Sequence, residues 1–437
     1  MTSTETISND SSMFRQRRKV QQSKHSRKPS EAPGDSENIE DVVLHKVDNF
    51  LYNLESKLDE LEEYGLQKLE DIDESVHQAY KVLQQVRDEA IGEGKRRAES
   101  LLHIVDRHYP TAVLDETKQV SSKLFNGIVA LEEKLSHVEE TCKWVTKQQL
   151  DEALAKAKHR LLNADDLPAP WRESINILQG YRFTERYVDC VVSVCQVHNE
   201  TCNIWSHLLG FGLIAYLFFY DLPSTQWWLT ATALDKFTIG FYMVSAMNAM
   251  ICSATWHAFS CLCMRQVKQK FACVDYSGIT MLIAATIVTC EYMSMYCQTT
   301  VRNAFMIVTS LCGLGGATFT WAPDFDKPQS RGKRIFFFVS FAVAGVSSFL
   351  TAAFLHGFWK TFFFYLPIMK SLLTYIGGVT FYGLQIPEKW YPGTIFDYIG
   401  ASHNLWHIAV VAAIYFHYNA MMGMLPHAAQ YSCGVNH

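Results

Sequence analysis

The feature that most constrains this chain is a series of seven apolar stretches in its C-terminal half. A helix needs roughly 20 apolar residues to cross a bilayer, and helices satisfy their own backbone hydrogen bonds in lipid. The stretches lie at about 204–220, 236–259, 275–297, 301–321, 334–356, 361–384 and 400–424. The chain is therefore predicted to be all-α, with a seven-transmembrane helical bundle over residues 203–424.

The orientation of this bundle is predicted from the basic residues in its short loops. The loops after the second, fourth and sixth stretches are the basic ones, with Arg265, Lys268, Lys270, Lys327, Arg331, Lys333, Arg334 and Lys389. The opposite loops hold only Lys236, Arg302 and Lys360. Because Lys and Arg favour the cytosolic side, and no signal peptide opens the chain, the N-terminus is predicted to be cytosolic. Residues 425–437 would form an extracellular or lumenal tail.

Composition adds little about partners or disulfides. The net charge of −5 is too small to indicate a partner, and no nucleic acid is expected. Of the 12 cysteines, 11 lie at or beyond Cys190, mostly inside the apolar stretches, where cysteine behaves as a small apolar residue. We therefore expect no disulfide framework. The apolar stretches predict an integral membrane protein, in the endoplasmic reticulum or the plasma membrane.

The N-terminal half is polar and divides into three regions. Residues 1–37 have the composition of a disordered basic tail. Residues 38–165 carry apolar residues at heptad spacing between Leu44 and Val145, which indicates two long helices with coiled-coil seams. The seams could form a folded-back hairpin or associate with another copy or a partner. Residues 166–202 are predicted to be a linker and an interfacial amphipathic helix.

Three histidines and one acid stand at the ends of the apolar stretches. His257 closes the second stretch, Asp275 opens the third, and His403 and His407 begin the last. The two histidines of the last stretch are four residues apart and share one helix face. The predicted orientation places all four groups near the cytosolic face. Polar groups at membrane depth are costly unless something binds them, and three neutral histidines are typical of catalytic zinc. Alternatively, each histidine is a packed or helix-end residue.

Two more residues could take part in chemistry at such a zinc site. Asn404 follows His403 and cannot take up a proton, so Asp275 is the acid/base candidate, either binding the metal or holding a water. Zinc lowers the pKa of a bound water to about 7. Ser253 precedes His257 by one helical turn and could bond that water or polarise a substrate carbonyl. A serine bonded to its own helix is the alternative.

These motifs resemble the progestin and adipoQ receptor family, which includes adiponectin receptors, fungal zinc-homeostasis membrane proteins and haemolysin-III-like proteins. The resemblance covers residues 168–424, and the long N-terminal extension is similar to one fungal branch. It is carried by Ser253 to His257, Asp275 to Ile279, Ser402 to His407, Gly180 to Arg182, Ile386 to Gly393, and Glu200, Asn203 and His207.

The resemblance implies a zinc ion held by His257, His403 and His407, with Asp275 reaching it through water. It also implies a cavity for a membrane lipid or sphingolipid-like ligand, a role in lipid signalling and zinc homeostasis, and ceramidase-like hydrolysis of a lipid amide. A non-catalytic receptor or metal-homeostasis regulator with structural zinc is the alternative.

Three further features of the sequence do not involve the three predicted histidine ligands. Leu262 occupies a position where adiponectin receptors usually carry a histidine. Lys370 lies within the sixth stretch, where it could pair with an acid or a lipid headgroup, or reach water beside a kink at Pro367. Glu200, Asn203 and His207 could extend the site, but we interpret them as capping and interhelical hydrogen-bonding residues.

Overall fold

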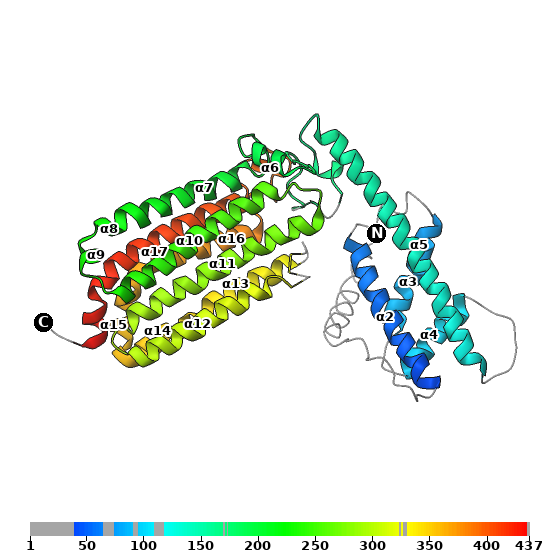
Figure 1. The fold of residues 1–437 in the computed structure, drawn as a ribbon, viewed down its shortest axis with the longest axis horizontal. Helices are drawn as coiled ribbons and strands as arrows, with labels where there is room; N and C mark the ends of the chain where they lie inside the picture. Colours follow the sequence, from blue (N-terminus) through cyan, green and yellow to red (C-terminus); the bar gives the residue numbers. More distant parts are fainter. Residues whose placement is uncertain are drawn as a thin grey trace, which may run out of the picture. The chain divides into compact units, whose positions relative to one another are not determined.

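The computed structural model describes residues 39–63, 74–90, 95–108, 118–168, 171–172, 174–322, 325–326 and 330–434 (Figure 1). Its secondary structure is helical apart from two isolated β-bridges, which confirms the all-α prediction. The basic tail predicted for residues 1–37 lies outside the described residues. The chain divides into two compact units, Met1–Gln148 and Gln149–His437.

The first unit is a bundle of helices with its own apolar core. It contains α2 (Ile39–Glu63), α3 (Glu74–Glu89), α4 (Lys95–His108) and the first part of α5 (Lys118–Ala157). Where two long helices were predicted, the described residues form four. Most heptad residues in the described part of this unit are buried together, including Leu54, Leu58, Leu83, Ile128 and Leu131. The seams therefore pack against one another within one chain.

Among the residues that the structure describes, the second unit contains six helical segments that are long and apolar enough to cross a membrane. The segments are Thr201–Ser224 (α7, η5 and α8), Ala233–Phe259 (α10), Arg265–Ser294 (α11), Arg331–His356 (α13 and α14), Phe358–Leu384 (α15, η7 and α16) and Ser402–Cys433 (α17). Helix α12 (Thr299–Phe319) takes the place of the expected fourth span. It is not among these six segments, and it carries the polar Arg302 and Asn303 near its start.

The helices of this unit lie side by side as a bundle (Figure 1). Residues of α7, α10, α11 and α17 form its main core, including Ile214, Tyr242, Leu282, Ile414 and Tyr418. The segment Phe358–Leu384 is interrupted by the 3₁₀ turn η7 (Leu366–Ile368), which contains Pro367. Lys370 follows this turn with an exposed side chain, in agreement with a break at the proline.

The interfacial helix expected over residues 171–202 is largely absent. Between α5 and α7 the described residues form only the 3₁₀ turn η3 (Ala164–Asp166) and the short helix α6 (Tyr187–Ser193) besides irregular structure. Trp171, Tyr181 and Phe183 are buried in a small core with Ala153, Leu162 and Leu167. Gly180 has a φ of +83° and lies against the Tyr398 ring. The apolar residues that suggested an amphipathic helix instead anchor a folded linker.

At the C-terminal end one pair of cysteines is bonded, contrary to the expectation that the cysteines act as small apolar residues, while the side of the membrane on which residues 425–437 lie stays a prediction. Helix α17 continues to Cys433, so most of the expected tail at 425–437 is helical. Cys433 forms a disulfide with Cys297, just beyond the end of α11, although 136 residues separate them in sequence. Ser432 strengthens the junction by accepting a hydrogen bond of 3.0 Å from the Cys297 amide. The pairing depends on the two helix ends meeting, which the composition could not indicate.

Candidate metal centre

Helices α10 and α17 supply the three histidines. His257 lies in the last turn of α10, and His403 and His407 lie in the first two turns of α17. The start of α17 is fixed by Glu388, whose buried carboxylate accepts hydrogen bonds from the Ser402 amide, at 2.7 Å, and the Ser402 hydroxyl. A carboxylate at a helix N-terminus accepts hydrogen bonds from the free amide groups there and interacts favourably with the positive end of the helix dipole. Glu388 thus sets where the helix with two of the histidines begins.

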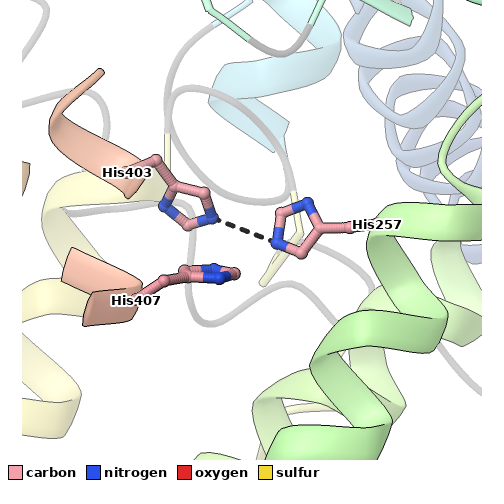
Figure 2. A group of neighbouring side chains, drawn as sticks. All are labelled: His257, His403 and His407. Atoms are coloured by element: carbon pink, nitrogen blue, oxygen red, sulfur yellow. Dashed lines mark hydrogen bonds between the residues drawn. The ribbon is translucent and has the colours of Figure 1, made fainter. Parts of the chain in front are cut away.

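The three imidazoles converge on one point (Figure 2). One ring nitrogen from each of His257, His403 and His407 lies within 4.8 Å of the others. The Nε2 atoms of His257 and His403 are 3.2 Å apart. His257 is 4% exposed and His407 is 1% exposed. The structure therefore brings together all three histidines that the sequence singled out, and the group could hold a metal ion.

The outer hydrogen bonds of the rings fit metal binding. The Nδ1 of His257 lies 2.7 Å from a Glu200 carboxylate oxygen and donates to it. The Nδ1 of His407 donates to the Asn203 carbonyl at 3.2 Å. In both rings the proton is thereby placed on Nδ1, which leaves the lone pair of Nε2 for a metal. Metal-ligating histidines are commonly oriented in this way by a carboxylate or a carbonyl.

Glu200 and Asn203 make the interhelical hydrogen bonds expected of them, beside the three histidines, but Glu200 does not cap α7. Glu200 stands at the start of α7, yet its side chain makes no capping hydrogen bond there. Instead it accepts from His257 and, at 2.7 Å, from the Asn203 amide. Asn203 in turn accepts a 2.6 Å hydrogen bond from Asn404 of α17. Burial alone would raise the pKa of the Glu200 carboxyl, but the His257 ring and the Asn203 amide hold it below its ordinary value.

His207 lies against the same group. Its ring stacks on that of His407 with centroids 3.7 Å apart and an angle of 8° between the planes. Glu200, Asn203 and His207 are spaced three and four residues apart, so they share one face of a helix. This spacing is the sequence signal for a helix face directed at the metal centre.

Ser253 and Asp275 lie on neighbouring helices beside the histidines. Ser253 is buried in α10 one turn before His257. The Asp275 carboxyl group interacts with the Ser253 hydroxyl and lies near His257, but it is not part of the three-histidine group. Helices α10 and α11 approach closely because Gly278 has no side chain; a Cβ there would lie 3.2 Å from the Ala249 Cα atom. The roles of Ser253 and Asp275 stay predictions.

Comparison with known proteins identifies sequences similar to this chain. The family model for haemolysin-III-related proteins matches residues 195–418. An uncharacterised protein of Schizosaccharomyces pombe is 33% identical over 91% of this chain and 92% of its own length. The ADIPOR-like receptor IZH3 of Saccharomyces cerevisiae is 30% identical, over 73% of this chain and 69% of its own. The human progestin and adipoQ receptor family member 3 is 27% identical, over 63% of this chain and 89% of its own length.

The first two similarities extend beyond the family model into the N-terminal half, because they cover 91% and 73% of the chain. The resemblance read from the histidine and acid motifs is thereby confirmed. The chain belongs to the haemolysin-III-related family of membrane receptor-like proteins, together with the adiponectin-receptor-like and progestin and adipoQ receptor proteins.

Proposed function

We propose that this protein is a zinc-binding membrane receptor-like protein that hydrolyses a lipid amide and acts in lipid signalling and zinc homeostasis. The observation that carries the proposal is the His257, His403 and His407 group with its Nε2 atoms turned inward. Three protein ligands leave a position open on zinc, as in catalytic sites, whereas structural sites use four. A zinc ion bound there would supply Lewis acidity and a more acidic water.

The chain's own residues have distinct roles in this proposal. Glu200 and Asn203 orient two of the histidine rings from outside. Asp275 stands outside the histidine group, where it can accept a proton from a water and return it to the leaving amine. Ser253 orients the Asp275 carboxylate, with which it interacts. Sphingolipid-like amides are the proposed substrates because the site is buried between apolar helices.

The proposed topology has seven spans, with α12 as the fourth, a cytosolic N-terminus and a lumenal or extracellular C-terminus. Two independent features support it. Basic residues gather in the loops at the histidine end of the bundle. The Cys297–Cys433 disulfide joins the C-terminal ends of α11 and α17, at the other end of the bundle from the histidines. Disulfides persist in oxidising compartments. The endoplasmic reticulum and the plasma membrane are both compatible with this arrangement. Self-association or partner binding through residues 44–145 stays a prediction.

One experiment tests the proposal in the full-length protein in lipid nanodiscs. Zinc per protein and hydrolysis of a short-chain ceramide are measured for wild type, His403→Ala and Asp275→Asn. We expect His403→Ala to lose zinc and hydrolysis, and Asp275→Asn to keep most zinc while hydrolysis collapses. Full zinc in His403→Ala would refute the metal centre. Full zinc with no turnover in wild type would favour the non-catalytic receptor.

A further inference from the structure

A second pair of sulfur atoms lies near the metal centre. The Sγ atoms of Cys190 and Cys261 are 3.4 Å apart, and both side chains are buried, at 0% and 6% exposure. Cys190 lies in α6, and Cys261 lies in the loop after α10. The two cysteines are 71 residues apart in sequence. Their contact is therefore a product of the fold.

The pair joins the linker before the first span to the end of the helix that carries His257. Both cysteines pack with Leu262 in one small cluster. Arg182 makes the same connection by hydrogen bonds, donating to the His257 carbonyl at 2.7 Å and to the Ala258 carbonyl at 3.1 Å. Arg182 also donates to the hydroxyl of Ser193, the last residue of α6. This region is consequently held in place whether or not the sulfurs are bonded.

The surroundings make Cys261 the more reactive sulfur. The hydrogen bond with Cys190 and the nearby Arg182 guanidinium lower the pKa of the Cys261 thiol, whereas the pKa of Cys190 is raised. Thiolates, not thiols, react with oxidants. Cys261 also lines a cavity together with Arg182, Glu200 and Ser260.

We propose that Cys190 and Cys261 form a reversible disulfide and constitute a redox-modification site four residues from His257. A disulfide has an S–S length of about 2.0 Å, so the two sulfurs at 3.4 Å need to approach by roughly 1.4 Å. The oxidant is a peroxide of the hydrogen peroxide class. Cys261 thiolate attacks one peroxide oxygen, giving the sulfenic acid and releasing hydroxide, which takes up a proton as water. The Cys190 thiol then gives up its proton, and its sulfur attacks the sulfenic sulfur; the S–O bond breaks, and the departing hydroxide leaves with that proton as a second water.

The two cysteine pairs of this chain then serve opposite purposes. Cys297 and Cys433 are bonded at the far end of α11 and α17. Cys190 and Cys261 are in contact but unbonded at the histidine end. In the proposed topology that end faces the cytosol, where thiols are kept reduced and disulfides are transient. Formation of the bond would report cytosolic peroxide at the metal centre.

The test uses full-length protein in nanodiscs, treated with graded hydrogen peroxide, then alkylated, digested and analysed by mass spectrometry. We expect a Cys190–Cys261 cross-linked peptide that disappears after reduction with dithiothreitol and persists in the control variant Cys195→Ser. Cys195 is exposed nearby and has no part in the pair. In Cys190→Ser, dimedone should label Cys261 at least tenfold more than in wild type, because the resolving thiol is gone.

Two outcomes would overturn the proposal. The first is a wild-type protein in which Cys190 and Cys261 stay fully alkylated at a peroxide dose that oxidises Cys195. The second is a cross-link that joins either cysteine to Cys195 or Cys263 instead. The wild-type measurement needs no substitution, so misfolding of a variant cannot obscure the answer. Zinc content and hydrolysis do not enter the readout, which keeps the test separate from the proposed function.

Discussion

Replacing Glu200 with glutamine tests whether the outer carboxylate supports the metal centre. Glu200→Gln keeps the side-chain size and an oxygen that can accept the His257 Nδ1 proton, but it removes the negative charge. The native hydrogen bond is 2.7 Å long, and the glutamate is buried. Charge-assisted hydrogen bonds are about twice as strong as neutral ones. The variant should therefore fold and bind zinc more weakly.

The size of the effect follows from the geometry. Loss of an outer-shell partner typically weakens metal binding by about 10–100-fold, which equals about 1.4–2.7 kcal/mol. Burial limits solvent screening and favours the upper end, whereas the retained glutamine oxygen preserves part of the bond. We expect roughly 30-fold weaker zinc binding for Glu200→Gln, in the middle of that range. Glu200→Ala also leaves His257 and Asn203 without their acceptor, so its loss should be roughly 100-fold.

The assay is competition for zinc between the nanodisc-embedded protein and a chromogenic chelator at neutral pH. Glu291→Gln is the matched control, because Glu291 is also a buried glutamate with a short hydrogen bond, 2.6 Å from Thr309, but lies near the other end of α11. Unchanged zinc affinity in Glu200→Gln would refute the outer-shell role. Equal weakening in Glu291→Gln would show that any buried charge loss has this effect.

Further predictions concern stability, helix position, pH and topology. Leu54→Ala, at a fully buried position of α2, should lower the free energy of unfolding of the first unit by about 2–5 kcal/mol, as measured by urea denaturation followed by circular dichroism. Glu388→Ala should loosen the start of α17 and reduce zinc occupancy, with partial recovery in Glu388→Gln; equal occupancy in all three proteins would contradict the positioning role. Burial and the nearby Arg182 lower the pKa of His198 from 6.5 to about 4. Because the folded protein holds that ring neutral, this stabilisation is present above pH 6.5 and is lost as the pH falls toward 4. The loss is on the order of 3 kcal/mol, and thermal unfolding of His198→Gln should have a shallower acid dependence. A protease-sensitive tag at the C-terminus should be cleaved only from the lumenal or extracellular side, and cleavage from the cytosol would reverse the topology.

The histidine centre shows how far local sequence patterns reach. The spacing of His403 and His407 on one helix face needed only the helical period. The position of His257 beside them followed from orienting the apolar stretches by their loop charges. Both inferences use information within one segment or its flanks, and the structure brings the three rings together.

The linker and the disulfide show where that reasoning failed. Trp171, Tyr181 and Phe183 have the composition of an interfacial helix, but they are buried in a local core with residues of α5 and of the segment that follows it. The pairing of Cys297 with Cys433 depends on where two helices end. In each case the deciding contact lies outside the short segment whose composition suggested the prediction.

By itself, the sequence determined the all-α class, the apolar segments, the heptad seams and the residues able to bind a metal, because hydropathy and periodicity are properties of contiguous residues. Only the tertiary structure decided that Glu200 orients His257, that Glu388 holds the start of α17, and that Cys190 lies against Cys261. The physical reason is that these contacts join residues 57, 14 and 71 positions apart, and their energies arise only once the packed helices bring the partners together.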